Sequence, residues 1–157
     1  MRVEIIPADT QIEAEALAAL DEKMFLPADC FPEPEDWRTY SAFWIMADGQ
    51  IAGSIALGLD MEFSGDRDID KPCPGCVYLA STGILPEFQR KGIGNFAKQW
   101  EIDWARSHGF KRISTHCRKS NQGSLRLNQK FGFKVIGEFS DYYEEPTEAT
   151  TIMELLL

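Results

Sequence analysis

The sequence predicts an α/β protein built on one mixed sheet, and three observations support this. A chain of 157 residues suits one domain and can bury a sizeable core. With 44% hydrophobic and 26% charged residues, its composition is that of a soluble globular protein. Segments with the period of strands alternate with segments that have the period of helices, in an order typical of helices packed on a mixed sheet.

The first half of the chain shows strand signals on both sides of helical ones. Asp48-Gly49 joins two apolar segments and is a good signal for a two-residue hairpin. A proline-bearing loop at 26–34 precedes a short helix that begins near Glu35. We expect strands at 2–6, 42–47 and 51–57, a helix at 12–25, and a long polar loop at 59–74.

The second half alternates strand and helix more regularly. Gly109 suits the left-handed position that ends a helix, and Ser120-Asn121 are good N-caps for the next one. We expect strands at 77–84, 112–117, 133–139 and 150–157, and helices at 93–108 and from Asn121 to about Phe131.

Charge and hydropathy narrow the function classes. The formal net charge of -9 argues against a nucleic-acid partner and suits a cationic substrate, although an acidity that only serves solubility fits equally well. No apolar run approaches the length of a membrane span, and no signal-peptide pattern opens the chain. We therefore expect a cytoplasmic protein without a membrane partner.

The four cysteines predict neither a disulfide scaffold nor a metal site. Cys73-Pro74-Gly75-Cys76 is a lone Cys-x-x-Cys, and a structural zinc site needs a second such pair or a histidine pair. Free thiols or an incidental loop pair are the favoured readings. A thioredoxin-like redox role is disfavoured because that motif opens a helix, whereas this one precedes a strand.

A turn rich in glycine and positive charge lies between strand 77–84 and helix 93–108. Gly92 and Gly94 carry no Cβ, so an anion can approach the main chain closely. The first N–H groups of the helix have no intrahelical partner, and the macrodipole adds partial positive charge. Arg90 and Lys91 add full charges. The turn therefore predicts a phosphate-binding site.

Two common phosphate motifs fit this turn poorly. A P-loop has four residues between its glycines and then Lys and Ser/Thr, which this segment lacks. A dinucleotide fingerprint is formally present as Gly92-x-Gly94-x-x-Ala97. That motif also needs an acid about 20 residues further on, and no acid lies between Asp103 and Glu138.

The segment Ile84-x-Pro86-x-x-Gln89-x-x-Gly92-x-Gly94 resembles the acetyl-CoA signature of the GCN5-related N-acetyltransferase (GNAT) family. Asn121 and the later Phe131-Gly132-Phe133 resemble another block of that family, so the resemblance covers residues 1–157 as one domain. It implies a mixed, mostly antiparallel sheet of about seven strands, flanked by about four helices and splayed at the central strands, where acetyl-CoA enters.

The resemblance also implies which residues bind the cofactor. They are Thr82, Gly83, Ile84, Gln89, Arg90, Lys91, Gly92, Ile93, Gly94 and Asn95, followed by Asn121, Ser124 and Asn128. The family often has Tyr at the position of Asn128, where the phenol protonates the leaving thiolate. An amide cannot supply that proton, so the thiolate leaves unassisted or another group serves. Ser124 is one candidate for a sulfur contact.

Tyr78 and His116 are the candidate catalytic residues, because their spacing resembles that of a Tyr and His in eukaryotic N-terminal acetyltransferases. In those enzymes the pair positions a water that relays a proton. The ordinary pKa of His, about 6.5, lies nearer that of an α-amine, about 7.7–8.0, than that of Lys, about 10.4. A His relay therefore suits an α-amine. The alternative is that both side chains simply pack.

Phe31-Pro32 and Tyr142-Tyr143 resemble the substrate loops of N-terminal acetyltransferases, including the ribosomal-protein alanine type. The favoured function is acetyl transfer from acetyl-CoA to a primary amine by direct attack, with a peptide N-terminus as acceptor. A small cationic amine (a polyamine, amino acid or aminoglycoside) is the alternative acceptor, and a non-catalytic acyl-CoA-binding module is the alternative class. The sequence decides neither the acceptor nor whether the protein is a monomer or a homodimer.

Overall fold

The computed structural model describes residues 1–66 and 69–157, and the side chains of 66–69 are left aside. The chain forms two compact units. Unit 1 comprises Met1–Gly58 and Ala80–Trp100, and unit 2 comprises Leu59–Leu79 and Glu101–Leu157. That the chain is one domain stays a prediction.

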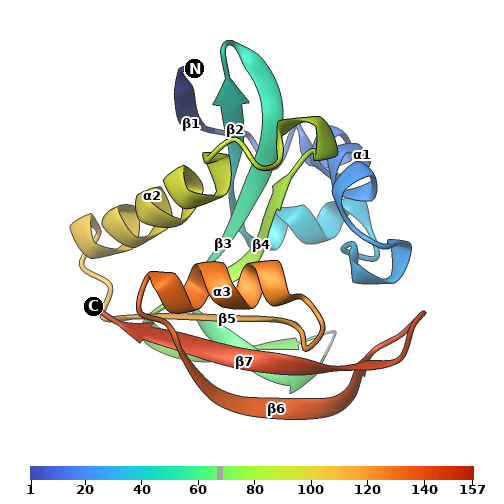
Figure 1. The fold of residues 1–157 in the computed structure, drawn as a ribbon, viewed down its shortest axis with the longest axis vertical. Coiled ribbons are helices and arrows are strands. Elements are labelled where there is room, and N and C mark those ends of the chain that lie inside the picture. The colour runs from blue at the N-terminus through green and yellow to red at the C-terminus, as the bar shows by residue number, and fades with distance from the viewer. Residues whose placement is uncertain (67–68) are drawn as a thin grey trace. The chain divides into compact units, whose positions relative to one another are not determined.

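The elements follow one another in the predicted order (Figure 1). The helices are α1 (Ala14–Met24), α2 (Ile93–Ser107) and α3 (Gln122–Lys130), with the shorter 3-10 helices η1 (Pro27–Asp29), η2 (Pro34–Thr39) and η3 (Pro86–Phe88). The strands are β1 (Val3–Pro7), β2 (Ser41–Ala47), β3 (Gln50–Asp66), β4 (Ile69–Ile84), β5 (Arg112–Arg118), β6 (Lys134–Tyr143) and β7 (Glu148–Leu156).

The described strands form a seven-stranded sheet in the order β1-β2-β3-β4-β5-β7-β6. Four of its pairings are antiparallel, namely β1–β2, β2–β3, β5–β7 and β6–β7, and β4–β5 is parallel. The parallel pairing joins Cys76–Tyr78 to Arg112–Ser114, while β4 continues to Ile84 and β5 to Arg118. With α1, η2, α2 and α3 as its four helices, the predicted fold is confirmed.

Unit 1 has its core where α1 and η2 pack on β2 and β3. Leu17 and Trp37 are fully buried there, beside Trp44 of β2. Trp44 Nε1 donates a 2.6 Å hydrogen bond to Glu13, the residue before α1. The predicted hairpin at Asp48-Gly49 is confirmed, because both residues adopt the left-handed conformation (φ 47° and 78°) that a tight hairpin turn requires.

The predicted polar loop at 59–74 is wrong, because strands occupy nearly all of it. β3 extends to Asp66 and β4 begins at Ile69. The polar side chains of this segment have partners elsewhere in unit 2. Asp60 accepts a hydrogen bond from the Gly75 amide, and Glu62 forms an ion pair with Arg112. These long-range contacts replace the apolar alternation that a strand normally shows, so local composition misled the prediction.

In unit 2, α3 lies along β5 and β7 (Figure 1). The side-chain oxygen of Asn121 accepts the Ser124 amide at 3.1 Å, which confirms the predicted N-cap. On the inner face of α3, Asn128 packs on Met153 of β7, whose side chain is fully buried.

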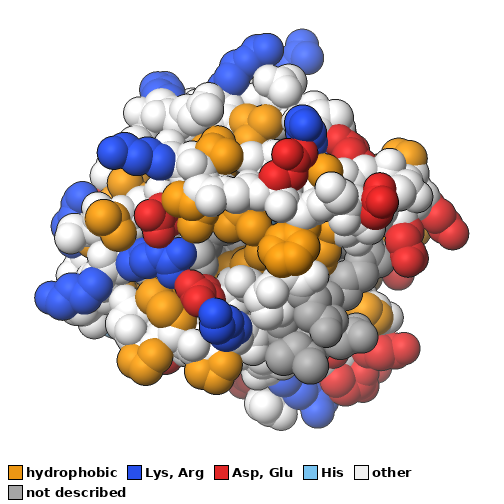
Figure 2. Space-filling model, turned by 90° about the horizontal axis from the view of Figure 1, so that it is seen from below, with side chains coloured by type: hydrophobic (Ala, Val, Ile, Leu, Met, Phe, Trp, Pro, Cys, Tyr) orange, Lys and Arg blue, Asp and Glu red, His pale blue; other side chains and the backbone are white. Residues whose placement is uncertain are grey.

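Some hydrophobic side chains stay exposed. Figure 2 shows one face of the molecule, on which hydrophobic side chains lie among acidic and basic ones. The exposed set includes Val135, Ile136 and Phe139 of the edge strand β6. Among the described residues, the helices are too short or too polar to span a bilayer.

Candidate active site

The cationic turn of unit 1 is shaped by its backbone. Its η3 segment is followed by Gln89, whose side-chain amide donates to the carbonyl of Ile84 at 3.0 Å and so ties the turn to the end of β4. Arg90 and Gly92 both adopt positive φ, 60° and 83°. The Phe96 amide then bonds to the Gly92 carbonyl at 3.1 Å, which starts the helical ladder of α2.

This turn fits a phosphate group. A Cβ built on Gly92 would meet nothing within 4 Å, so open space lies beside the main chain at the helix N-terminus. The side chains of Arg90 and Lys91 are exposed. Open space at a helix N-terminus and two exposed cations are what an anionic cofactor needs.

Gly83, predicted to bind the cofactor, also has a packing role. A Cβ at this position would come within 2.7–2.8 Å of Met24 and Phe25 at the end of α1. A Cβ on Gly53 of β3 would collide with the Gly83 carbonyl. The two glycines therefore allow β3, β4 and α1 to approach closely. The flanking Thr82 and Ile84 stay partly exposed.

The candidate residues on α3 differ in their exposure. Asn121 is exposed and its side-chain oxygen caps the helix, while Ser124 is partly exposed. Asn128 is only 3% exposed, and its amide donates to the sulfur of Met153 at 3.8 Å. Asn128 thus packs in the core of unit 2. Its predicted contact with the cofactor stays a prediction.

Tyr78 and His116 lie together in unit 2. The Tyr78 hydroxyl is 2.7 Å from His116 Nε2, a direct hydrogen bond between neighbouring strands β4 and β5. The two rings stack with centroids 5.8 Å apart and an interplanar angle of 11°. The sequence spacing had suggested a shared water. The structure instead joins the two side chains directly.

The tautomer of His116 follows from its other neighbours. Thr150 donates its one hydroxyl hydrogen to the Cys117 carbonyl at 3.1 Å. With that hydrogen on the carbonyl, Thr150 Oγ1, which is 2.9 Å from His116 Nδ1, accepts there, and this network assigns the hydrogen to Nδ1. Nε2 then holds the lone pair, and Tyr78 donates its hydroxyl hydrogen to it.

Aromatic rings pack against His116, which stays partly exposed. Phe63 stacks on it at 3.8 Å between centroids, Tyr142 meets it edge-on at 5.3 Å, and the Tyr143 hydroxyl is 3.2 Å from Nδ1. Burial in this cluster lowers the pKa of His116 to about 3. The ordinary pKa that the sequence analysis assumed for His116 is therefore too high. His116 is neutral at physiological pH.

The two predicted substrate segments lie in different units. Tyr142-Tyr143, in unit 2, belongs to the His116 cluster, and Arg118 lies over the Tyr143 ring at 4.5 Å. Phe31, in unit 1, packs on Trp37 and Tyr40 with centroids 4.9 and 5.1 Å apart. Pro32 is exposed. The role of all four residues in acceptor binding stays a prediction.

Sequence reasoning missed Phe63, Thr150 and Arg118. Phe63 fell in the segment read as a polar loop. Thr150 gave no signal beyond its place in the last strand, because its contact with His116 spans 34 residues of sequence. Arg118 holds the β6–β7 connection by donating to the carbonyls of Glu144 and Pro146 at 2.9 and 2.7 Å.

The cysteines divide into a bonded pair and two free thiols. Cys73 and Cys76 form a disulfide, whereas Cys30 and Cys117 are thiols outside any disulfide. No cluster of three or more metal-ligating side chains occurs within 1–66 and 69–157.

The chain belongs to the acetyltransferase (GNAT) family, because the model of that family matches residues 13–133. Among sequence relatives, it is 30% identical to N-alpha-acetyltransferase 50 of Danio rerio over 51% of this chain and 49% of that protein. It is 27% identical to the spermine/spermidine N(1)-acetyltransferase of Bacillus subtilis over 69% of each chain. The chain spans about half the length of the first of these relatives, as it does for the probable N-acetyltransferase san of Drosophila melanogaster.

Solved structures confirm the fold. The ribosomal-protein-S18-alanine N-acetyltransferase of Escherichia coli superposes with a TM-score of 0.78 at 18% identity, covering 99% of this chain and 94% of that one. An acetyltransferase of Bacillus subtilis solved with CoA gives the same TM-score and identity, covering 99% of both chains. The predicted family is confirmed by the family model.

Proposed function

We propose that this protein is an acetyl-CoA-dependent N-acetyltransferase that acts on a primary amine, and that a peptide α-amine is its favoured acceptor. The observation that carries the proposal is the hydrogen-bonded series Tyr78–His116–Thr150 inside an aromatic cluster of a GNAT chain. The fit of the Arg90–Gly92 turn to a phosphate supports the cofactor, as do family membership and the relative solved with CoA.

The bound cofactor supplies the acetyl group as a thioester that a neutral amine attacks. Within the chain, the Tyr78 oxygen can take a proton from the acceptor, directly or through water, while its own hydrogen moves to His116 Nε2. Thr150 holds Nδ1–H and so keeps Nε2 available. Because the pKa of His116 is about 3, His116 passes the proton on and does not keep it. The proton ends on the CoA thiolate, which leaves as the thiol.

The low pKa of His116 favours amine substrates that are already neutral when they bind. At pH 7.5 an α-amine of pKa about 7.8 is about one third neutral, whereas an alkyl amine of pKa about 10.4 is about 0.1% neutral. A weakly basic relay therefore favours the α-amine by roughly two orders of magnitude in reactive fraction. That preference agrees with the N-terminal acetyltransferases among the relatives.

The test is CoA release by the purified chain with matched acceptors: a peptide with a free N-terminus, the same peptide with a blocked N-terminus and one lysine, and spermidine. We expect the free N-terminus to give the highest kcat/KM. His116→Ala should lower kcat with little change in acetyl-CoA affinity, whereas the exposed His108→Ala should leave both unchanged. Binding of acetyl-CoA without turnover of any acceptor would instead favour a non-catalytic module.

A small polyamine is the second candidate acceptor. It is supported by the match to the Bacillus subtilis spermine/spermidine enzyme over 69% of this chain and by the net charge of -9. The exposed Glu144 and Glu145 would attract such a cation. Faster turnover of spermidine than of the free peptide N-terminus, with strong salt dependence, would favour this candidate.

A further inference from the structure

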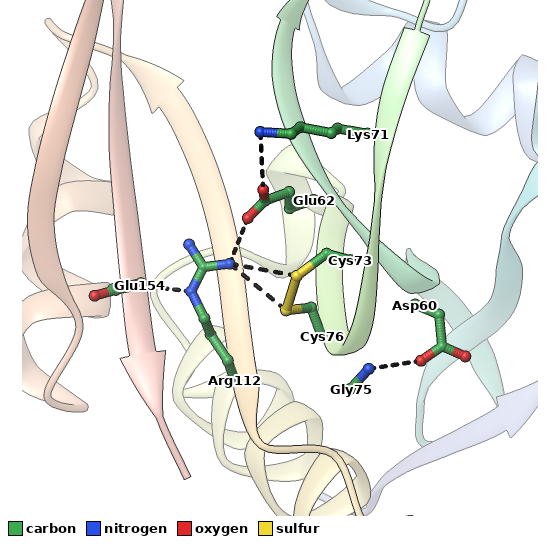
Figure 3. Close-up of a disulfide and its surroundings, with 8 residues drawn as sticks. All are labelled: Asp60, Glu62, Lys71, Cys73, Gly75, Cys76, Arg112 and Glu154. Carbon is green, nitrogen blue, oxygen red and sulfur yellow. Dashed lines mark hydrogen bonds and ion pairs between the residues drawn. A yellow bond between two sulfur atoms is a disulfide. The ribbon is translucent and has the colours of Figure 1, made fainter.

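Cys73 and Cys76 face each other across a tight turn near the start of β4 (Figure 3). Their Cα atoms are 5.5 Å apart, a usual separation for a disulfide. The two sulfurs differ in access, because Cys73 is partly exposed whereas Cys76 is 5% exposed. An outside thiol or disulfide would therefore reach Cys73, with Cys76 as the inner partner.

The turn between the cysteines is held by contacts other than the disulfide. Gly75 adopts positive φ, 82°, which suits glycine. Its amide donates to Asp60 at 2.8 Å, and its carbonyl accepts from the Lys111 amide at 2.8 Å. These two contacts hold the turn independently of the S–S bond. The two sulfurs stay close in the dithiol form, which favours a reversible pair.

Arg112 reaches both sulfurs (Figure 3). Its Nη1 is 3.6 Å from the sulfur of Cys76 and 4.0 Å from that of Cys73. Glu62 and Glu154 hold the guanidinium in place with 2.6 Å ion pairs to Nη1 and Nε. The carboxylates offset part of its charge, but Nη1 still donates toward both sulfurs. A charge-assisted N–H donor of this kind stabilises a thiolate.

We propose that Cys73 and Cys76 form a site of reversible thiol–disulfide exchange with small disulfides such as oxidised glutathione, and that Arg112 stabilises its reduced form. The Cys73 thiolate attacks one sulfur of glutathione disulfide, forming a mixed disulfide and releasing one glutathione thiolate. The Cys76 thiolate then attacks the Cys73 sulfur, closing the protein disulfide and releasing the second glutathione. The two thiol protons pass to the two released thiolates, and the pair loses the two electrons that glutathione gains.

The exchange site differs from a thioredoxin-like site in how it activates sulfur. In a thioredoxin-like motif the helix N-terminus lowers the thiol pKa, whereas here the motif lies within strand β4 and not, as predicted, before a strand. The guanidinium of Arg112 takes the place of the helix. Cys30 provides a contrast within the same molecule, since burial and the nearby Asp21 raise the pKa of its thiol to about 11.

The test is a glutathione titration of the whole chain. The protein is equilibrated at fixed ratios of reduced to oxidised glutathione, quenched in acid, alkylated and mapped by mass spectrometry. We expect Cys73 and Cys76 to change together, without a stable adduct, at a midpoint inside the glutathione range. Cys30 should stay a thiol throughout. A pair that stays fully oxidised or fully reduced at every ratio would overturn the proposal.

Two variants test the part played by Arg112. Arg112→Met should raise the equilibrium constant for disulfide formation about tenfold or more, a midpoint shift of about 30 mV per tenfold. The matched control is Lys71→Met, which removes a cation that also pairs with Glu62 but does not contact the sulfurs, and should change the constant less than twofold. If Arg112→Met does not fold, Arg112→Lys serves, with a smaller shift in the same direction. Equal constants for the wild type and the Arg112 variant would refute the role of Arg112.

Discussion

Thr150→Val tests whether Thr150 fixes the tautomer of His116. The substitution keeps the shape of the side chain and removes its oxygen, so Nδ1–H loses a 2.9 Å acceptor that is fully buried. A buried donor without a partner costs about 1–3 kcal/mol. The tautomer with hydrogen on Nε2 avoids that cost, but it can no longer accept the Tyr78 hydroxyl hydrogen.

The magnitude follows from these two tautomers. If only the Nδ1–H form relays the proton, a shift of about 1.4–2.8 kcal/mol lowers kcat about 10–100-fold and leaves acetyl-CoA affinity unchanged. The remaining contact of Nδ1 with the Tyr143 hydroxyl at 3.2 Å limits the loss. Thr150→Ser, which restores the hydroxyl, should recover most of the activity.

The assay that does not depend on the acceptor is NMR of ¹⁵N-labelled histidine. The chain has two histidines, so the spectrum contains one other imidazole, that of the exposed His108. We expect the His116 signals to report Nδ1–H in the wild type and a change in Thr150→Val. Thr151→Val is the matched control, because adjacent strand residues point to opposite faces. If Thr150→Val and Thr151→Val show the same His116 tautomer and the same activity, the reasoning fails.

Three further outcomes follow from the structure. Gly92→Asp should abolish acetyl-CoA binding by calorimetry, whereas Gly49→Asp, which imposes the same positive-φ strain on another open turn, should fold and bind normally. Because the folded pKa of His116, about 3, lies below the unfolded value near 6.5, stability should fall as pH drops through that window, by up to about 1.4 kcal/mol per pH unit. The slope of the unfolding free energy against pH, measured by denaturant titration, should be smaller in His116→Asn and unchanged in His108→Asn. Asn128→Tyr should lower the Tm by about 2–12 °C and not raise turnover, because the added ring overpacks a 3% exposed site; a stable variant with faster CoA release would contradict this.

The parts of the fold that the sequence predicts well are those set by local chemistry. Asn121 caps α3 because its short side chain reaches back to the Ser124 amide. Gly109 follows α2 with φ 80°, a conformation that other residues adopt at a cost. Asp48-Gly49 forms its hairpin for the same reason. Each signal lies within a few residues of the feature it determines.

The strands at 59–74 are not predicted by local chemistry, because the residues that stabilise them lie far away in the sequence. Phe63 has a neighbour in His116, 53 positions further along the chain, and Glu62 has one in Arg112. Gly65 is required by the Phe139 ring, which a Cβ there would strike at 2.3–2.8 Å. The sequence in isolation shows five acidic residues around Gly65, a composition typical of a loop. The strand becomes favourable once the partners from β5 and β6 are in place.

His116 shows how the same limit affects chemistry. Its residue type and spacing indicate a proton relay. From the sequence alone, however, only the ordinary pKa of a solvated imidazole can be assumed. The cluster that lowers this pKa to about 3 is assembled from Phe63, Tyr142 and Tyr143, which come from two other strands. Because His116 is such a weak base, it cannot deprotonate a charged amine. The amine substrate must therefore bind in its neutral form. The enclosure of His116, more than its identity, is therefore the reason to expect an α-amine over a lysine or a polyamine.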